Sequence, residues 1–501
     1  MSGVPAGRVW VHAALLTALC ALVYLPGLGS TGLSMSEGHR AIPAWEMLGD
    51  ARAGDTHWFE PRMFGTMYLR KPPGALWAIA GVSAVLGETE LAARLPGALA
   101  STLLALGVFA FSVRWFGAPW ALAGGAVQAL LPVMVPGGRS AEIEPLHAAG
   151  VGLVCLAAID LGTARARLWV VALAATGACA AALVKGPAGL PVMIGAIVGP
   201  AIVGRSARRG VTALTSVALG LVLAWVTLGS FRDAMGRPGA VTQGAGEFLW
   251  RSWGGVLVLV PATLASLLPA SLALVFPWGR KAKEEAGASE YAARQVLTAR
   301  ALAWSVVSAL VVMAAGGVDN PRYALPVCAL VTPLTGYVAR GAWGGLFGAR
   351  RASIARAMML GRPWAWIAAL LAGALVRALV VEPRASTSGR EAGIALAAHL
   401  PDGAEVWGDE LIEARPEVLW YARREAASQG RTVRVRWVKG LGSAAVPTPP
   451  GVLLALRSDG LVDECSGWVD VEEIARGAVY KYRYVLCAPG SNGSGPAEDP
   501  P

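Results

Sequence analysis

Eleven apolar segments, each roughly 17 to 25 residues long and so able to cross a bilayer, limit how this chain of 501 residues folds. With 55% hydrophobic residues, 15% charged residues and a mean hydropathy of +0.52, the chain is too apolar for one soluble core with a solvated surface. The sequence therefore predicts an all-α polytopic membrane protein with about 11 to 13 transmembrane helices. The predicted spans are 10–28, 96–114, 118–137, 146–163, 167–184, 188–204, 211–230, 254–278, 299–316, 323–340 and 363–381.

The cations lie in small clusters between the apolar segments. The formal net charge is +10, but the arginines do not form one basic domain, so nucleic-acid binding is not indicated. Clusters such as Arg205, Arg208 and Arg209 fall in every second loop, and the positive-inside rule makes these loops and the N-terminus cytoplasmic. Everything after about residue 383 is then expected on the outer side.

Two apolar segments have a second interpretation. Arg8 precedes the apolar stretch 11–25, as in a secretory signal peptide, but no A-x-A cleavage site follows, which favours an uncleaved first span. Residues 74–87 are apolar but short, so we expect an interfacial or re-entrant helix there. If they do span the membrane, a compensating span must exist elsewhere.

The chain divides into three regions. Residues 1–382 form the predicted membrane domain, in which 29–95 is a long first outer loop. Residues 383–487 alternate helix-like stretches such as PEVLWYARREA with strand-like ones such as TVRVRWV, which predicts a small outer α/β domain. The final stretch, 488–501, is rich in Gly, Ser and Pro and is expected to be disordered.

The six cysteines divide by location. Four lie in apolar spans, where small buried packing residues are the simplest interpretation. Cys465 and Cys487 lie in the outer tail, where an oxidising compartment permits a disulfide, and we expect one between them. Because no CxxC motif or His/Cys cluster occurs, a structural zinc site is not predicted.

The first outer loop carries the most informative motifs. In SEGHRAIPAWEMLGD the residues Ala41, Ala44, Trp45 and Leu48 recur at helical spacing, which predicts an amphipathic helix at the membrane surface. Glu37 stands at its beginning, where the helix N-terminus stabilises a carboxylate. Glu37 is therefore either an ordinary helix-start acid or a functional one.

The same loop ends in YLRKPPGALW. Proline fixes φ and disfavours helix at the residue before it, so Pro72 and Pro73 hold Lys71 in an extended segment just ahead of an apolar stretch. An ammonium held at the lipid boundary is suited to bind a phosphate headgroup as a point charge. The alternative is a lysine whose stem lies in the membrane and whose charge reaches the interface.

Three other outer turns, GGRSAEIEPL, LVKGPAG and DNPRYALP, carry isolated charges. The first places Arg139, Glu142 and Glu144 at the mouth of a span, the second places Lys185 between two spans, and the third places Arg322 at the start of another. Ionisable residues at membrane depth are costly and usually lie near water, a partner or a ligand. Taken singly, each is a topological anchor; together they put carboxylates and cations on one face of the membrane.

The ordered set SEGHR, EML, PRMFG-x-x-YLRKPP, ETELAARLPGALA, R-x-x-E-I-E, LVKGPAGL and RYALP resembles the bacterial family 39 glycosyltransferases of the GT-C superfamily. These are relatives of the aminoarabinose transferases and of protein O-mannosyltransferases. The resemblance extends from about residue 34 to 330. It implies a GT-C-like body in the bacterial inner membrane, amphipathic helices in the first periplasmic loop and a periplasmic C-terminal domain. It also implies transfer of a sugar from a polyprenyl-phosphate donor to an acceptor on the outer side.

The resemblance assigns the acidic positions. The family opens its first loop with an Asp-Glu pair, which here is Ser36 and Glu37, and His39 follows in the same motif as a further candidate. The second acidic position of the family matches Glu144, five residues after Arg139. Because a serine hydroxyl cannot accept a proton near neutral pH, the resemblance implies that Glu37 or Glu144 is the catalytic base, or that activity is lost.

The resemblance also assigns the cations. Lys71 matches the family lysine that contacts the donor phosphate, and Lys185 matches the lysine of the KGP turn. Arg322 and Tyr323 match the RY-x-LP segment. Arg322 or Arg251 is expected to help Lys71 offset the charge of the leaving phosphate.

The leading hypothesis is thus an inverting membrane glycosyltransferase that takes a polyprenyl-phosphate sugar as donor and a lipid, glycan or protein as acceptor. No Gly-rich nucleotide loop occurs, and no cofactor or dedicated metal cluster is expected, although a divalent metal is not excluded. One alternative is a catalytically inactive lipid-phosphate-binding or transport protein of the same fold. Another is an envelope assembly protein whose outer domain binds a partner.

Overall fold

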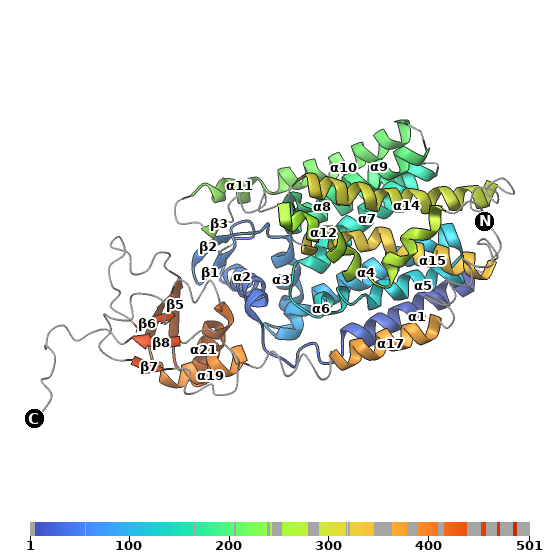
Figure 1. The fold of residues 1–501 in the computed structure, drawn as a ribbon. Helices are drawn as coiled ribbons and strands as arrows, with labels where there is room; N and C mark the ends of the chain where they lie inside the picture. The colour runs from blue at the N-terminus through green and yellow to red at the C-terminus, as the bar shows by residue number, and fades with distance from the viewer. Residues whose placement is uncertain are drawn as a thin grey trace, which may run out of the picture.

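The computed structural model describes residues 6–55, 57–164, 166–204, 207–237, 241–242, 253–278, 290–316, 318, 321–344, 363–377, 388–408, 415–437, 452–456, 468–470 and 484–487. A bundle of long helices makes up most of it, and a smaller group of short helices and strands is gathered at one end (Figure 1). The N-terminus lies at the opposite end of the bundle.

Each of the eleven predicted spans overlaps a helix of the bundle. By length and composition, five helical stretches of the described ranges are able to cross a membrane, and one of them, Leu168–Gly204, joins α8 to α9 through the 3-10 turn η1 (Gly186–Gly189). The helices of the bundle are α1 (Ala6–Tyr24), α4 (Glu90–Phe116), α5 (Ala118–Leu130), α6 (Met134–Gly138), α7 (Glu144–Thr163), α8 (Leu168–Lys185), α9 (Leu190–Gly204), α10 (Ala207–Thr227), α11 (Gly229–Met235), α12 (Trp253–Ser266), η3 (Ala270–Trp278), α14 (Glu290–Ala315), η4 (Pro321–Val327), α15 (Cys328–Gly344) and α17 (Pro363–Val376).

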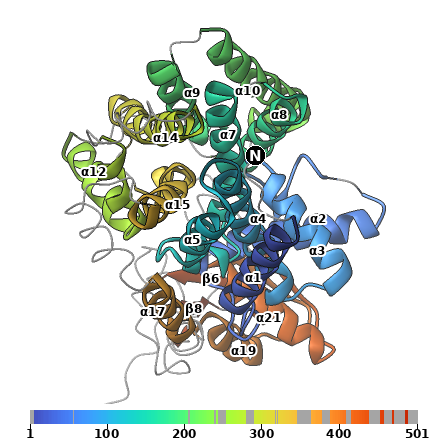
Figure 2. The same cartoon turned by 90° about the vertical axis from the view of Figure 1, so that its right-hand side faces the viewer.

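Small residues let the helices of the bundle pack closely. A Cβ added at Gly195 of α9 would lie 2.6 Å from the backbone nitrogen of Ala309 in α14, and one at Gly199 would lie 2.5 Å from the carbonyl oxygen of Ala301. Such close contacts between backbones are common among membrane helices. In lipid the hydrophobic effect does not drive helices together, so they associate through van der Waals packing, which small residues make possible. Helix α7 is almost entirely buried, and Figure 2 shows it among α4, α8, α9 and α10.

The first outer loop folds into α2 (Met35–Arg52), the hairpin of β1 (Arg62–Met63) and β2 (Thr66–Leu69), and α3 (Gly74–Leu86). The hairpin turns through Phe64 and Gly65, both with positive φ (50° and 77°), as in a two-residue primed turn. Strand β2 also pairs in parallel with β3 (Val241–Thr242), which comes from far along the chain. The short helix expected at 74–87 is therefore confirmed as a helix by α3.

The C-terminal elements form the predicted α/β arrangement. A five-stranded sheet in the order β5-β4-β6-β8-β7 has parallel pairs β5-β4 and β4-β6 and antiparallel pairs β6-β8 and β8-β7. The elements are α19 (Ser388–His399), β4 (Ala404–Gly408), α21 (Pro416–Ser428), β5 (Val433–Trp437), β6 (Val452–Leu456), β7 (Trp468–Asp470) and β8 (Tyr484–Cys487).

Helix α2 does not present its apolar face to lipid as expected from its sequence. Ala41, Ala44, Trp45 and Leu48 are all buried in a hydrophobic cluster shared with α3, α19, α21 and β5. The rings of Trp45 and Trp420 have their centroids 4.4 Å apart. The helical spacing was thus read correctly, but protein rather than membrane covers this face, because the C-terminal elements fold back onto the loop.

Some expectations fall outside the described ranges. Cys465 and residues 488–501 belong to this part of the chain, so the disulfide with Cys487 and the disorder of the tail stay predictions. The boundary at 382–383 also falls there. Of the four cysteines expected to be buried packing residues, Cys20, Cys155 and Cys328 are buried free thiols, whereas Cys179 is a free thiol that is only partly buried.

The contact between Trp45 and Trp420 provides a test of how the C-terminal elements are held. Replacing Trp420 by alanine removes a buried aromatic side chain and should destabilise the protein by about 3 to 5 kcal/mol. Trp10→Ala, at a side chain that is 75% exposed, is the matched control and should change stability little. Thermal unfolding of the purified full chain measures both, and equal melting temperatures for the two variants would contradict this packing.

Candidate functional site

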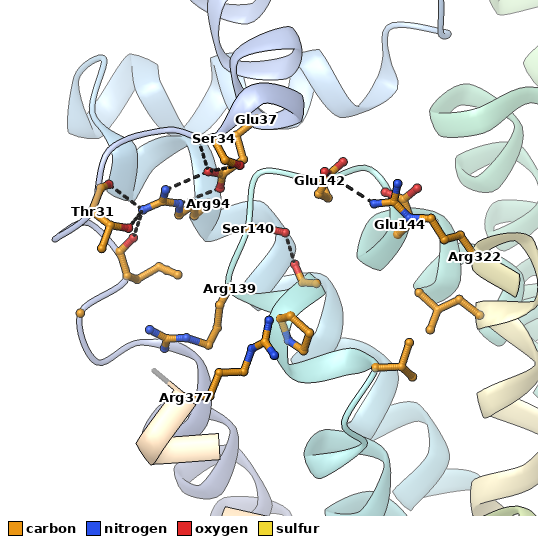
Figure 3. A pocket seen from close by; sticks show the side chains of 16 residues that line it. Thr31, Ser34, Glu37, Arg94, Arg139, Ser140, Glu142, Glu144, Arg322 and Arg377 are labelled. Atoms are coloured by element: carbon orange, nitrogen blue, oxygen red, sulfur yellow. Dashed lines mark hydrogen bonds and ion pairs between the residues drawn. The ribbon is translucent and has the colours of Figure 1, made fainter. Parts of the chain in front are cut away.

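A pocket of about 410 Å³ opens at the end of the bundle that carries α2 and α3. Five segments that are far apart in the sequence line it (Figure 3). They are the α1–α2 linker with the start of α2, the start of α4, the turn from α6 to α7, η4, and the end of α17. The charged residues of the lining are Glu37, Arg94, Arg139, Glu142, Glu144, Arg322 and Arg377.

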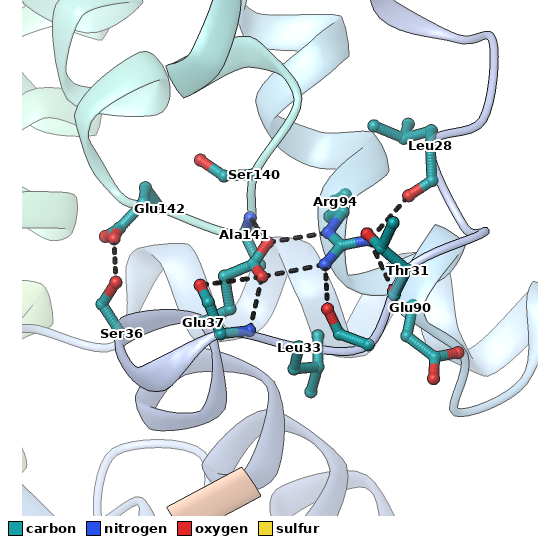
Figure 4. Close-up of polar contacts among 12 residues, drawn as sticks. Leu28, Thr31, Leu33, Ser36, Glu37, Glu90, Arg94, Ser140, Ala141 and Glu142 are labelled. Atoms are coloured by element: carbon teal, nitrogen blue, oxygen red, sulfur yellow. Dashed lines mark hydrogen bonds and ion pairs between the residues drawn. The ribbon is translucent and has the colours of Figure 1, made fainter. Parts of the chain in front are cut away.

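A buried ion pair forms one wall of this pocket. Glu37 accepts hydrogen bonds from Nε and Nη2 of Arg94, at 2.7 and 2.9 Å, and each side chain is 4% exposed. The backbone nitrogens of Ser34 and Ala141 also donate to Glu37, at 2.8 and 2.9 Å. Arg94 in turn donates to the carbonyl oxygens of Leu28, Thr31 and Gly32 (Figure 4). This network fastens the α1–α2 linker, α2, α4 and the turn before α7 to one another.

The contacts of Glu37 fix its charge. Burial raises the pKa of its carboxyl, but the hydrogen bonds and charge of Arg94, together with the amides of Ser34 and Ala141, outweigh burial and leave the pKa below its ordinary value. A carboxylate has about four acceptor positions, and these contacts occupy them. The expectation of a helix-start acid is therefore the better account of Glu37, since little capacity remains for an acceptor proton.

A second pair of acids lies beside this network. The hydroxyl of Ser36 donates to the carboxylate of Glu142, and Arg322 lies 3.8 Å from the same carboxylate oxygen. Glu144 forms an ion pair of 3.2 Å with Lys185, whose ammonium nitrogen lies 4.5 Å from the ring centre of Tyr323. Both glutamate side chains are 14% exposed. The positions thus bring four of the sequence motifs into one place.

The environments of Glu142 and Glu144 differ. Burial raises the pKa of the Glu142 carboxyl, and the negative charge of Glu144 raises it further, against smaller opposing effects of Ser36, Arg40 and Arg322. Glu144, by contrast, has the ammonium of Lys185 in direct contact. Two neighbouring carboxyl groups with such different partners are suited to different roles in proton transfer.

Lys71 reaches this group from the loop. Gly74, three residues later, packs so closely against α8 that an added Cβ would lie 2.6 Å from the carbonyl oxygen of Leu183. This contact brings the start of α3 beside the C-terminal end of α8, where Lys185 lies. The charges of Lys71, Lys185 and Glu144 all act on the buried His147 of α7, which places the half-buried Lys71 near His147, although Lys71 does not line the pocket.

Other residues singled out in the sequence have structural contacts. Arg139 donates to the carbonyl oxygens of Val23, Tyr24 and Pro26 at the end of α1, although it also lines the pocket. His39 is buried and stacks on Tyr68, with ring centroids 5.6 Å apart. Arg251 lies outside the described ranges.

The sequence motifs assign no role to Arg94, Glu142 and Arg377, which line the pocket, or to Arg40 beside it. Arg94 stands in the ETELAARLPGALA motif, but nothing local reveals that it pairs with Glu37. Glu142 was seen only as a charge at the mouth of a span, and Arg40 was not considered although its charge acts on both Glu142 and Glu144. The acidic spacing E-I-E was the one available signal for Glu142.

Comparisons with known proteins agree with the motifs and the fold. Residues 70–229 match the family model described as dolichyl-phosphate-mannose-protein mannosyltransferase. The fold is similar to that of ArnT from Cupriavidus metallidurans in the apo state, with 19% identity, a TM-score of 0.65, and 98% of this chain and 100% of that chain covered. The same protein bound to undecaprenyl phosphate matches with 18% identity, a TM-score of 0.64 and coverages of 97% and 99%. Among curated protein sequences, none matches this chain significantly.

The structural matches confirm the predicted fold class, and the family model agrees with the predicted resemblance over residues 70–229. The chain is a mostly helical, multi-span membrane protein with an ArnT-like GT-C fold and small C-terminal α/β elements. The oligosaccharyltransferase of Archaeoglobus fulgidus also matches, with 11% identity, a TM-score of 0.48 and coverages of 89% and 69%, which is too distant to support an argument.

The Glu37–Arg94 pair yields a prediction for stability. Glu37→Gln leaves the buried guanidinium without its counter-charge and should cost about 3 to 5 kcal/mol of unfolding free energy. Because the folded pKa of Glu37 is lowered, this stabilisation is fully present above the unfolded value of about 4.3 and is lost as the pH falls through the folded pKa.

The control for this prediction is Glu60→Gln, which breaks an ion pair with Arg237 whose cation is 51% exposed. It should cost at most about 1 kcal/mol. Chemical unfolding of both variants at pH 7, with the parent as reference, measures the difference. A Glu37 variant as stable as the Glu60 variant would show that the buried pair does not hold the loop.

Proposed function

We propose that this chain, whose residues 70–229 match the mannosyltransferase family model and whose fold is that of ArnT, is a membrane glycosyltransferase. It would transfer a hexosyl or pentosyl group from a polyprenyl-phosphate donor to a lipid, glycan or protein acceptor on the periplasmic side. The observation that carries this proposal is the meeting of cations and carboxylates from separate segments at one end of the bundle. The undecaprenyl phosphate bound to ArnT is a polyprenyl phosphate, which supports this class of donor.

The cations are assigned to the donor phosphate. Arg322 lies 3.8 Å from Glu142, and its side chain is 62% exposed at the pocket. The charge of Lys71 acts on His147, as does that of Glu144. As the bond from the anomeric carbon to the phosphate oxygen breaks, negative charge grows on the phosphate and these cations stabilise it. Lys185 is paired with Glu144, so it is assigned to holding that carboxylate and not to binding the phosphate. Arg251 stays a candidate for the same role.

Glu142 is the best candidate for the base. The acceptor oxygen attacks the anomeric carbon from the face opposite the phosphate, and its proton passes to a carboxylate. A base is most effective when its pKa approaches the working pH, and the pKa of Glu142 is raised by burial and by Glu144. Ser36 holds the Glu142 carboxylate through its hydroxyl, so a serine at this position is compatible with activity.

The other two acids then have supporting roles. Glu144 stays ionised beside Lys185, and its second carboxylate oxygen has no hydrogen-bond partner among the described residues. Because this oxygen is buried, Glu144 is assigned to balancing the charge of Lys185 and not to direct contact with the acceptor. Glu37, saturated by Arg94 and two backbone amides, acts as a positioning residue that holds the turn carrying Glu142.

A second candidate function is lipid-phosphate binding or transport without catalysis. The observation that favours it is Ser36, which cannot serve as a base. The same cations would bind polyprenyl phosphate in such a protein, but the sugar would never leave the donor.

The two functions are separated by transfer from radiolabelled polyprenyl-phosphate hexose and pentose donors in proteoliposomes that contain native membrane acceptors. Lys71→Met keeps most of the apolar stem but loses the charge, and should lower transfer by roughly tenfold to over a hundredfold. Glu142→Gln keeps the shape but cannot take a proton, so turnover should fall by about 10² to 10⁴ while donor binding persists.

Arg294→Gln is the control for these variants, because it changes an exposed arginine whose ion-pair partner among the described residues is Glu290 on the same helix. It should transfer like the parent. Donor binding by a parent that never releases the phosphate would favour the second function. Full transfer by both Lys71→Met and Glu142→Gln would exclude the catalytic assignment.

A further inference from the structure

A second pocket, of about 490 Å³, lies where the first outer loop meets the C-terminal elements. It shares no lining residue with the first pocket. Its walls are the middle of α2, the β1–β2 turn, α21 and the whole of β5. Thr66 donates to the carbonyl oxygen of Trp437 at 2.8 Å, which ties the turn to the end of β5.

Three arginines line this pocket against one acid. Strand β5 alternates buried and exposed residues, so Val433, Val435 and Trp437 face the core while Arg434 and Arg436 point outward. β5 is the edge strand of the sheet and pairs only with β4 among the described strands. Arg436 contacts Glu405 of β4, whereas Arg434 has no hydrogen-bond or ion-pair partner among the described residues.

Arg423 of α21 completes the set of cations. Its guanidinium lies 3.4 Å from Glu46 of α2 and 5.8 Å from the ring centre of Phe64. Phe64 has a φ of 50°, a conformation that is strained for a large side chain, and the hairpin holds it there with its ring buried. The turn thus keeps an aromatic ring against one of the arginines at the pocket wall.

The acid of the pocket is only partly ionised near neutral pH. Burial raises the pKa of Glu46 to about 7, against opposing effects of Arg423 and the amides of Gly65 and Phe64, while Asp50 adds to the rise. With Arg423 beside Glu46 and Arg436 beside Glu405, Arg434 leaves the pocket with an excess of positive charge, which increases as the pH falls below 7. Guanidinium groups match phosphate and carboxylate oxygens in geometry as well as charge.

We infer that this second pocket binds an anionic group, a phosphate, sulfate or carboxylate borne by a glycan or a lipid headgroup, between Arg423, Arg434 and Arg436. Glu46 opposes binding when it is ionised and allows it when it is protonated. The inference stands on the lining of the pocket and does not need sugar transfer.

In sugar transfer the second pocket would anchor the acceptor, and this role of the pocket rests on the proposed function. Helix α2 contributes Glu37 to the first pocket and Glu46 to the second. Nine residues at about 1.5 Å each separate them by about 13 Å along the helix. Nine residues also make about two and a half turns, so Glu37 and Glu46 lie on opposite faces of α2. An acceptor would therefore need its charged group more than about 13 Å from its nucleophilic oxygen to engage both pockets at once.

Equilibrium dialysis with radiolabelled inorganic sulfate tests the binding, because the charge of sulfate does not change between pH 6 and 8. The full chain is held in phosphatidylcholine nanodiscs, in an Arg322→Gln, Arg377→Gln background that removes two cations lining the first pocket. Sulfate should bind several-fold more tightly at pH 6 than at pH 8. Arg434→Gln should weaken binding at pH 6 by about tenfold or more.

Glu46→Gln provides the second variant. It removes the titrating group, so its affinity at pH 8 should equal that of the parent background at pH 6. Arg294→Gln, at an exposed arginine on α14, should bind like the parent background. Sulfate binding that is unaffected by Arg434→Gln, or a pH dependence that survives Glu46→Gln, would overturn the inference.

Competition then identifies the source of the anion. Displacement of sulfate when phosphatidylglycerol replaces part of the phosphatidylcholine assigns the pocket to a lipid headgroup, and tighter binding of glucose 6-sulfate than of sulfate assigns it to a glycan. If neither competes, the class of ligand named here is wrong. A protein that passes the dialysis test but transfers no sugar would retain the binding site and lose only its proposed use.

Discussion

The ion pair between Glu37 and Arg94 is the contact on which the arrangement of the site depends. Burying two charges costs several kcal/mol for each ion, and the cost is recovered only where the remaining hydrogen-bonding capacity is also satisfied. Here the backbone amides of Ser34 and Ala141 donate the remaining hydrogen bonds to the carboxylate. Carbonyl oxygens of the α1–α2 linker accept those of the guanidinium. Because the donors and acceptors come from four segments, the pair fixes the turn that carries the acids.

Glu142 and Glu144, the two acids on that turn, have different neighbours and therefore different proposed roles. Glu144 meets a buried ammonium, so its charge is balanced inside the protein. Glu142 meets a serine hydroxyl and a more distant, largely exposed guanidinium, so burial dominates its titration. The same E-I-E sequence thus supplies an ionised group and a proton acceptor about two residues apart, as pairs of unlike carboxyl groups do in many active sites.

The sequence predicted the parts of this structure that depend on local pattern. Apolar spans, the helix beginning near Glu37 and the break at Pro72 and Pro73 all follow from composition and backbone preferences over a few residues. The partners could not be predicted in this way. Arg94 lies 57 residues from Glu37, and Glu142 lies 106 residues from Ser36, so only the packing of α2 against α4 and the turn before α7 reveals them.

The burial of α2 shows the same limit. Its apolar spacing was read from Ala41 to Leu48, but periodicity cannot distinguish lipid from protein as the covering surface. The cover comes from α21, more than 350 residues later in the chain, as the contact of Trp45 with Trp420 shows. The second pocket lies between these same elements, so the sequence pattern could not predict it either.

The central claim is that Glu142 takes the acceptor proton while Ser36 favours its ionised form, and the pH profile of sugar transfer by Ser36→Ala tests it most directly. The groups that face Glu142 are Ser36 and Arg40 from α2, Glu144 from α7 and Arg322 from η4. Losing the Ser36 hydrogen bond removes support for the carboxylate and should raise its pKa further. The rising limb of the profile should then move to higher pH with an unchanged plateau; a limb that stays in place would contradict the assignment.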